Sequence, residues 1–254
     1  MMKPASSHRA LLRRSLLLIV AASALAWATR NYSIAKAEDN AANQSGIATT
    51  IARPENALGL FDGKDESQWV VWGQPGEAGD WPVQDGTMVT AHHDIATKEK
   101  FKDFQLHVEF NEPELPPDKT GQDRGNSGVY LQGRYEIQVL DSFHNETYPD
   151  GACAAVYGVS APLVNAAKPP GQWQTYDINF RTARFKDGKK VEPARVTIYW
   201  NGQLVQNNTL IPHPTGGGAP ETDEGGPVRL QFHEHAVKYR NIWIVPLKEE
   251  QEKK

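Results

Sequence analysis

Hydrophobic residues at every second position recur along most of this chain, and this alternation constrains the fold more than any other feature. In FQLHVEF (104–110) apolar residues alternate with Gln105, His107 and Glu109. Side chains two residues apart share one face of a strand, so one face is buried and the other is solvated or functional. No stretch after residue 37 keeps an apolar period of 3.6 residues over three turns. The period of two returns in three later segments and in a final predicted strand, namely 176–180, 195–200, 228–233 and 237–247.

Turn residues separate these predicted strands. Asp85-Gly86 lies between two short β-prone runs in WPVQDGTMVT (81–90), and Asn201-Gly202 follows the strand predicted at 195–200. Both dipeptides favour tight two-residue hairpin turns. The chain also contains 17 Pro and 21 Gly. Many antiparallel strands joined by such turns predict an all-β fold, an antiparallel β-sandwich of the jelly-roll type in one domain.

The two ends of the chain differ from this central part. Residues 1–37 carry six Lys or Arg, no acidic residue and the apolar run LLLIVAASALAWA at 16–28, which predicts an export signal. That run is shorter than the roughly 20 residues of a membrane-spanning helix, so we expect no permanent anchor and a periplasmic or secreted protein. The other predicted boundaries are a polar linker at 38–56, the jelly-roll domain at 57–247 and a charged tail at 248–254.

Charge and motif content exclude several classes of function. Without residues 1–37 the chain has 21 basic residues (27 less 6) against 31 acidic ones, a formal charge near −10, which argues against nucleic-acid binding. Cys153 is the single cysteine, so no intrachain disulfide can form, and we expect a small buried hydrophobe there. The sequence has no Gly-rich phosphate loop, no Gly-x-Ser-x-Gly and no HExxH. We therefore expect no nucleotide cofactor.

The stretch GNSGVYLQGRYEIQVLD (125–141) gives the first candidate site. Alternation places Tyr130 and Gln132 on one face of a first strand, and Glu136 with Gln138 on the matching face of a second strand across a hairpin. One interpretation is an ordinary amphipathic hairpin whose polar side meets solvent. The other is a sugar-binding face, because planar amides and carboxylates hydrogen-bond hydroxyl groups while an aromatic ring packs on a pyranose.

A later segment supplies a second polar row of similar character. Arg229, Gln231 and His233 share one face of the strand predicted at 228–233. Imidazole titrates near neutral pH, so His233 could act as an acid or a base. His92-His93-Asp94 resembles a metal-binding run, but adjacent side chains of an extended segment point to opposite faces, which argues against a metal site.

Two further polar residues are predicted to be structural. Asp141 precedes Ser142 and is expected to cap a turn. Asn241, between Arg240 and Ile242, is expected to satisfy backbone groups at the edge of the sandwich.

Six segments in a fixed order carry a resemblance to a known family. The chain resembles the 3-keto-disaccharide hydrolase domain family, also described as 3-keto-glucoside 1,2-lyases or hydratases, whose fold is a concanavalin-like or laminin-G-like jelly roll. Phe232 and Glu234 stand where this family usually has Asp and Gly. The segments that match are 60–69, 125–143, 151–158, 169–180, 194–202 and 226–247.

This resemblance implies cleavage of glycosides that are already oxidised at C3 of the sugar. A ketone at C3 acidifies the C2 proton, so a base can remove it and the C1 substituent leaves by β-elimination; water can then add back to give net hydrolysis. A bound divalent cation could replace arginine as the electrophile, and a separate sugar oxidoreductase would have to supply the 3-keto sugar. The implied roles are Glu136 and His233 as base and acid in either order, Arg124 and Asn126 as donors to the enolate oxygen, and Tyr130, Gln138 and Gln231 as sugar contacts.

Two alternative functions fit the same fold. A non-catalytic carbohydrate-binding module would use the polar face to hold a sugar without cleaving it. A retaining glycosidase would use Glu136 with a second carboxylate, and Glu136-x-Gln138-x-x-Asp141 has the spacing of such a pair. In that motif the middle carboxylate is replaced by an amide and Asp is one methylene shorter than Glu, so the roughly 5–5.5 Å separation of a double displacement is disfavoured.

Overall fold

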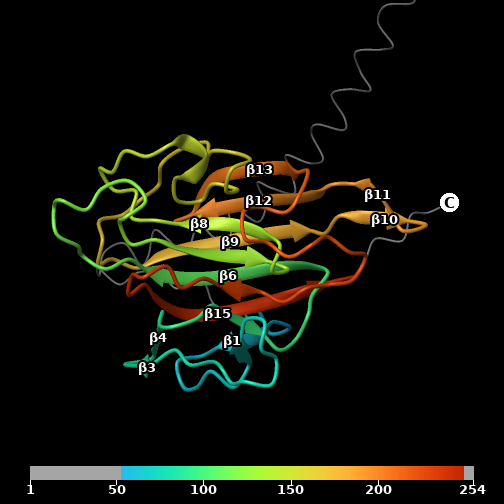
Figure 1. Cartoon of the computed structure of the whole chain (residues 1–254), viewed down its shortest axis with the longest axis horizontal. Helices are drawn as coiled ribbons and strands as arrows, with labels where there is room; N and C mark the ends of the chain where they lie inside the picture. Colours follow the sequence, from blue (N-terminus) through green and yellow to red (C-terminus); the bar gives the residue numbers. More distant parts are fainter. Residues whose placement is uncertain (1–52, 249–254) are drawn as a thin grey trace, which may run out of the picture. The chain divides into compact units, whose positions relative to one another are not determined.

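The computed structural model of the chain describes residues 53–248, and two antiparallel sheets face each other within them. The large sheet has eight strands, whose order can be followed from top to bottom in Figure 1. They are β13 (Gln203–Ile211), β12 (Ala194–Trp200), β9 (Gln174–Arg181), β6 (Asp103–Asn111), β15 (Lys238–Leu247), β4 (Thr87–Val89) and β3 (Val83–Gln84), with β1 (Leu58–Phe61) also paired to β15.

The small sheet has five strands and carries the candidate site. A separate two-stranded hairpin and one short 3₁₀ helix complete the described elements. The small sheet runs in the order β2 (Trp69–Val71), β5 (Ile95–Thr97), β14 (Arg229–Leu230), β7 (Ser127–Leu131) and β8 (Tyr135–Val139); the hairpin is β10 (Arg184–Lys186) with β11 (Lys189–Glu192), and the helix is η1 (Pro149–Gly151).

The predicted antiparallel jelly-roll sandwich is confirmed by these sheets. Four of the predicted strands appear as β6, β9, β12 and β15 with bounds close to those expected. The strand predicted at 228–233 is shorter, because only Arg229 and Leu230 pair with both neighbours and the chain then leaves the sheet. The predicted export signal (1–37), residues 38–52 of the predicted linker and residues 249–254 of the predicted tail lie outside the described residues.

Left-handed backbone at the predicted hairpin turns explains their sequences. Asp85 and Gly86 join β3 to β4 with φ angles of 50° and 74°, and Asn201 and Gly202 join β12 to β13 with 51° and 77°. Positive φ at both turn residues matches the right-handed twist of the flanking strands, and Asp, Asn and Gly tolerate it best. The two predicted hairpins are therefore confirmed.

The core lies between the two sheets and is filled by the alternating apolar residues. Leu106 and Val108 of β6 enter it from the large sheet, and Val129 and Ile137 enter it from β7 and β8, all of them almost fully buried. Burying one such side chain contributes roughly 1.5–3 kcal/mol. Cys153 is also fully buried, with its Sγ 3.0 Å from the Tyr176 hydroxyl, as expected for a small structural thiol.

The outward face of the small sheet is polar for the same reason that its inward face is apolar. Because successive side chains alternate, strands that direct Val129 and Ile137 into the core direct Tyr130 and Glu136 to the other side. Loops cover this outward face, since Tyr130 and Glu136 are almost fully buried. None of the helices between residues 53 and 248 is long and apolar enough to cross a membrane.

Candidate functional site

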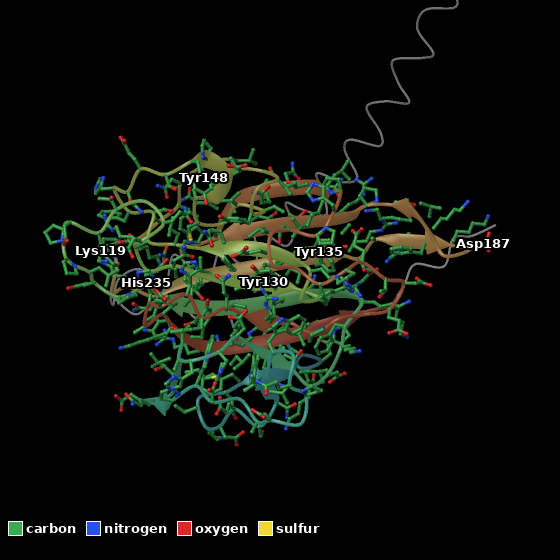
Figure 2. The ribbon with its side chains drawn as sticks, in the orientation of Figure 1. Lys119, Tyr130, Tyr135, Tyr148, Asp187 and His235 are labelled. Atoms are coloured by element: carbon green, nitrogen blue, oxygen red, sulfur yellow. The ribbon has the colours of Figure 1, made fainter. Side chains whose placement is uncertain are left out.

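Strand register places Tyr130 at the centre of the outward face. In β7 and β8 it lies directly opposite Glu136, and in β14 its partner is Arg229. The next pair on this face of the hairpin is Gly128 with Gln138. A phenol, a carboxyl and a guanidinium thus lie side by side on three adjacent strands. Tyr130, the phenol of this row, is labelled in Figure 2.

A cavity of about 310 Å³ opens over this row. Loop residues after β13 form part of its wall, and Tyr157 closes another side. The cavity contains one carboxylate, one guanidinium, one imidazole and several amides, which is the polar inventory of a small-molecule site. Its lining residues are Gln122, Asn126, Tyr130, Glu136, Gln138, Tyr157, Gly216, Gly217, Arg229, Gln231 and His233.

Glu136 is the only carboxylate in this lining, and its environment brings its pKa close to neutral. Burial raises the pKa to about 7, although the Tyr130 hydroxyl and the charge of Arg229 act in the opposite direction. The Tyr130 hydroxyl donates to Glu136 Oε2 at 2.9 Å. Across the hairpin, a Cβ at Gly128 would lie 2.5 Å from Glu136 Oε1, so glycine leaves the room that this carboxyl occupies. Such a carboxyl exchanges protons near pH 7.

Arg229 is the cation of the cavity, and its side chain is immobilised from several directions. Its guanidinium lies 3.6 Å from the centre of the Tyr130 ring and 4.9 Å from that of Trp72. Asp94 Oδ2 lies 3.1 Å from Arg229 Nε, and Arg229 NH1 donates to the Gly217 carbonyl at 2.9 Å. The sequence pattern places Arg229 on the polar row but assigns it no role. Its stacking partners are distant in sequence, so the pattern of its own strand does not reveal this position.

Amide side chains form the remaining polar wall. Gln138 Nε2 donates to Gln122 Oε1 at 2.9 Å, Asn126 Nδ2 donates to the Gln122 carbonyl at 3.0 Å, and Gln231 Nε2 donates to the Tyr130 hydroxyl at 3.3 Å. The Oε1 atoms of Gln138 and Gln231 are buried and accept no hydrogen bond from the described residues. Buried acceptors of this kind are suited to receive hydrogen bonds from ligand hydroxyl groups.

Gln132 does not share this face, contrary to the predicted alternation. It lies in the turn after β7 with a φ of 57°, and this left-handed conformation redirects its side chain. Gln132 Nε2 donates to the Phe101 carbonyl at 2.8 Å, and its Oε1 accepts from Thr182 Oγ1 at 2.9 Å. Gln132 therefore joins interior loops rather than the cavity.

Arg124 also lies apart from the lining residues. Its Nε and NH2 contact Asp141 Oδ2 at 2.8 Å and 2.6 Å, and the Asp141 side chain is almost fully buried. Asp141 Oδ1 accepts from the Phe143 backbone at 3.0 Å, which confirms the predicted turn cap. The structure thus brings together Asn126, Tyr130, Glu136 and the remaining predicted site residues, but it pairs Arg124 with Asp141 instead.

His233 lies exposed at the rim of the cavity, parallel to His235. The two rings are 6.4 Å apart at an angle of 8°. His235 Nδ1 accepts from the Asn126 backbone N–H at 3.2 Å, so this pair adjoins the amide wall. Glu234, where the family usually has Gly, has a φ of 61°. The backbone therefore keeps a conformation typical of glycine, despite the larger residue.

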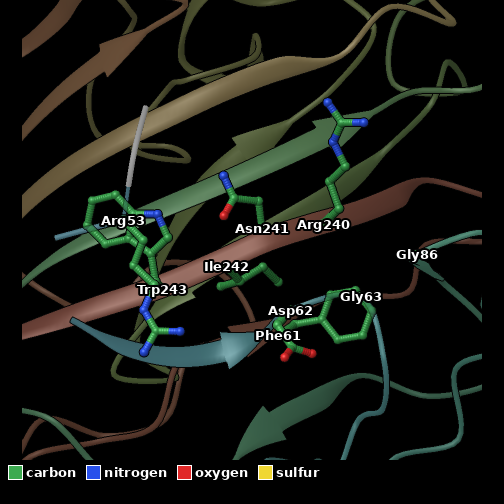
Figure 3. A pocket seen from close by; sticks show the side chains of 9 residues that line it. All are labelled: Arg53, Phe61, Asp62, Gly63, Gly86, Arg240, Asn241, Ile242 and Trp243. Carbon is green, nitrogen blue, oxygen red and sulfur yellow. The ribbon is translucent and has the colours of Figure 1, made fainter. Parts of the chain in front are cut away.

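A second cavity of about 240 Å³ lies where β1 meets β15 (Figure 3). Its lining includes Arg53, Arg240 and Asn241, and its carboxylate, Asp62, is exposed and pairs with Lys64 at 3.2 Å. An exposed carboxylate that is already paired with a lysine is less suited to acid–base chemistry than the buried carboxyl of the first cavity. Asn241 Nδ2 donates to Glu109 Oε1 at 2.8 Å, so this residue contacts a side chain rather than the predicted backbone groups.

No cluster of metal-binding side chains occurs within residues 53–248. No three His, Cys, Asp or Glu side chains in that range lie close enough to hold an ion. In the His92-His93-Asp94 run, His93 Nδ1 lies 2.9 Å from Asp80 Oδ2, while Asp94 Oδ1 accepts from the Phe232 backbone at 2.9 Å. These side chains thus have separate partners.

The chain is similar to a known domain family and to solved structures. A family model described as the 3-keto-alpha-glucoside-1,2-lyase-like domain matches residues 57–245. A crystal structure from Parabacteroides distasonis ATCC 8503, described as a putative glycosyl hydrolase, is 36% identical with a TM-score of 0.71, covering 81% of this chain and 96% of that one. A second protein of that organism with the same description is 19% identical with a TM-score of 0.55, covering 80% and 99%, and shows the fold alone.

No curated protein matches the chain. The family model and the 36% identical relative nevertheless agree on a carbohydrate-active protein with a jelly-roll fold. The chain belongs to the 3-keto-alpha-glucoside-1,2-lyase-like domain family.

Proposed function

We propose that this protein cleaves glycosides oxidised at C3, with Glu136 as the base that removes the C2 proton. The observation that carries the proposal is a single buried carboxyl with a pKa of about 7, placed beside an immobilised guanidinium in an amide-lined cavity. A base is most effective when its pKa lies near the working pH. The ketone at C3 lowers the pKa of the C2 proton, so a base as weak as a carboxylate suffices to remove it.

The elimination assigns a task to each neighbouring group. Glu136 takes the C2 proton, the electron pair forms the C1=C2 bond, and the bond from C1 to its oxygen breaks. Negative charge develops on the C3 oxygen, and Arg229 is the cation of the cavity that can stabilise it. The leaving oxygen receives a proton from His233 or from the newly protonated Glu136. Addition of water across the new double bond then gives net hydrolysis.

The amide wall supports recognition of a sugar. Gln138 and Gln231 each present a buried Oε1 atom that accepts no hydrogen bond from residues 53–248. Sugar hydroxyls can donate to both atoms, and discrimination follows because a ligand without these hydroxyls leaves buried acceptors unsatisfied. The resemblance implies Asn126 as a donor to the enolate oxygen. Its Nδ2 already donates to the Gln122 carbonyl, so we assign Asn126 to the sugar-binding wall instead.

A retaining glycosidase mechanism receives less support from the same geometry. Double displacement needs two carboxylates roughly 5–5.5 Å apart. Glu136 is the one carboxylate in the cavity lining, and Asp141 is held by Arg124. A non-catalytic binding module is the second candidate, because the Glu136 carboxyl is already held by the Tyr130 hydroxyl and so also suits a rigid binding face.

Purified protein mixed with 3-keto-glucosides and with their unoxidised parents tests the proposal. Enone absorbance reports the elimination product, and released aglycone reports total cleavage. We expect turnover of the keto sugars alone, with Glu136→Gln lowering kcat at least 100-fold while equilibrium binding persists. Asp62→Asn, an exposed carboxylate at the other cavity, is the control and should leave both unchanged.

Saturable binding of a plain glycan without turnover of any keto sugar would instead establish the binding module.

Two predictions from the sequence belong to the same proposal. Residues 1–37 predict that the reaction takes place after export, in the periplasm or outside the cell. A separate sugar oxidoreductase must then supply the ketone, because the elimination itself oxidises nothing.

A further inference from the structure

Tyr148 presents an exposed aromatic ring beside the candidate site, and the proposed function gives it no task. Tyr148 is 44% exposed, so much of its side chain is accessible to a ligand. Its hydroxyl lies 2.5 Å from the hydroxyl of Tyr157, which lines the cavity. The two ring centres are 6.2 Å apart at 73°. Tyr148, labelled in Figure 2, directly precedes the short helix η1.

The position of this ring is fixed by the backbone beneath it. Tyr148 lies against Gly151, where an added Cβ would come within 2.0 Å of its Cε2 atom, so the ring rests directly on the glycine backbone. The Gly151 carbonyl in turn accepts from Gln122 Nε2 at 2.9 Å and from Gln138 Nε2 at 3.3 Å. The floor of the cavity and the support of the ring are therefore one hydrogen-bonded unit.

Tyr157 joins the same ring to the strand that carries the base. Its backbone N–H donates to the Glu136 carbonyl at 3.1 Å. A hydrogen bond links the two ends of the segment that connects the tyrosines, since the Gly158 N–H donates to the Asp150 carbonyl at 2.9 Å. The rim formed by Tyr148 and Tyr157 is thus one part of the cavity edge that is hydrogen-bonded to the Glu136 segment.

The size of the cavity shows what this rim can contact. At about 310 Å³ it is at the small end of ligand pockets and suits one pyranose ring. Any ring attached to that sugar at C1 must therefore extend past the cavity edge. Aromatic rings pack well on flat, C–H-rich faces, and a ring that is already immobilised loses little entropy when it does so.

We propose that Tyr148, held in place by Tyr157, is a specificity-determining residue that packs on a second ring carried at C1 of the substrate. This inference rests on the proposed function, because it concerns the group that leaves in the elimination. A sugar ring and an aryl ring share the flat face that Tyr148 would contact. Tyr148 touches the leaving group and takes no part in the proton transfer at C2.

Three substrates show whether Tyr148 contacts a sugar ring or an aryl ring at C1. They are a 3-keto-disaccharide, an aryl 3-keto-glucoside and methyl 3-keto-glucoside, which has no second ring. We expect Tyr148→Ala to raise KM about tenfold for the disaccharide, with kcat unchanged, and to leave methyl 3-keto-glucoside unaffected. Tyr148→Phe keeps the ring and should keep most of the affinity. An equal rise for the aryl glucoside means that the ring recognises flat groups in general, and no rise there means that it recognises sugar.

Tyr199→Ala removes a tyrosine of β12 from the large sheet and is the matched control. The inference is overturned if Tyr148→Ala leaves KM for the disaccharide unchanged, or changes KM for methyl 3-keto-glucoside by the same factor. If the wild-type protein turns over none of the three, the proposed function has failed instead. The rim is then tested by equilibrium binding of the same three sugars, and equal Kd values for wild type and Tyr148→Ala with the disaccharide would overturn it.

Discussion

The carboxyl of a single side chain, Glu136, depends on two neighbours, Tyr130 and Arg229, for its acid–base behaviour. Burial opposes ionisation of its carboxyl, while the Tyr130 hydroxyl and the Arg229 charge favour it, and the balance is a pKa of about 7. Neither neighbour is adjacent in sequence to Glu136. Pairing across β7, β8 and β14 brings them together, so the acid–base behaviour of this residue belongs to the sheet as much as to the side chain.

Tyr130→Phe tests this balance with almost no change in shape. Loss of the hydroxyl removes a hydrogen bond to the ionised carboxyl, so the pKa of Glu136 should rise and a base would be protonated up to a higher pH. We expect the acidic limb of the kcat/KM profile, which lies near pH 7 in the wild type, to shift upward. Tyr199→Phe serves as the control. An unchanged or lowered midpoint contradicts the role of Glu136 as the base.

His107, on the outer face of the large sheet, is a second buried ionisable residue. Burial alone would lower its pKa, but hydrogen bonds and charges from Asp177 and Glu109 overcome this and raise the pKa to about 9. Its Nδ1 lies 2.7 Å from Asp177 Oδ1, and its ring stacks on Trp243 at 5.0 Å. A protonated imidazole is therefore built into the sheet at neutral pH.

Asp177→Asn should destabilise the protein in a pH-dependent way. A raised histidine pKa stabilises the fold fully below the unfolded value of 6.5, and this stabilisation is lost as pH rises through about 9. We expect a cost of roughly 1–2 kcal/mol in the free energy of unfolding at pH 6, shrinking by pH 10. Urea denaturation at several pH values measures it. A cost that does not vary with pH would mean that His107 is neutral in the fold.

Much of the candidate site follows from alternation in the sequence, and its exceptions have local causes. Tyr130, Glu136 and Gln138 share a face as predicted, because β7 and β8 keep regular register. Arg124 was expected as a donor within the site, but it lies outside the cavity lining and pairs with Asp141, 17 residues further along the chain. The position of Arg229 depends on Trp72 and Tyr130 stacking around it, which no single strand pattern encodes.

At the scale of elements, turns determine which strands are neighbours. The Asn201-Gly202 turn fixes the pairing of β12 with β13 at the edge of the large sheet. Asn-Gly and Asp-Gly were recognisable from the sequence because both residues tolerate the positive φ that a two-residue hairpin turn requires. The length of β14 was not, since its strand-like pattern continues to residue 233 while the Phe232 N–H leaves the ladder to bond Asp94 at 2.9 Å.

Gly202→Ala should destabilise the protein through backbone conformation alone. Gly202 has a φ of 77°, and an added Cβ would meet no atom within 4 Å, so no clash contributes. We expect a loss of about 1 kcal/mol in the free energy of unfolding. Gly76→Ala, at a site with equal space and no positive φ, should change it by less than about 0.5 kcal/mol. Thermal or urea denaturation of both variants provides the comparison, and equal effects would contradict the backbone explanation.

At the scale of the whole molecule, one buried charge opposes the sandwich at alkaline pH. Glu112 is fully buried just after β6, and burial raises its pKa to about 8, although Gln174 donates to both of its oxygens at 3.0 Å and 2.8 Å. Ionisation of a fully buried carboxyl is costly, and the nearby charge of Asp141 opposes it further. The fold therefore favours the protonated carboxyl.

Stability should fall as pH rises because of this residue. Glu112 binds its proton more tightly in the folded than in the unfolded chain, so unfolding releases protons between pH 4.5 and about 8. Its contribution approaches a loss of about 1.4 kcal/mol per pH unit in that window. We expect Glu112→Gln to flatten the fall between pH 5.5 and 8.5, measured by urea denaturation. A parallel fall in the variant would assign it to other groups.

The alternation that builds the sandwich also ties its chemistry to its correct assembly. Val129 faces the core and Tyr130 faces the cavity because they are neighbours on one strand of the small sheet. A slip of β7 by one residue would exchange them, placing a phenol among the apolar side chains and an isopropyl group beside Glu136. Such a slip would expose apolar side chains to water and remove the phenol from the candidate site. We therefore expect a register slip in β7 to disrupt the core and the candidate site together.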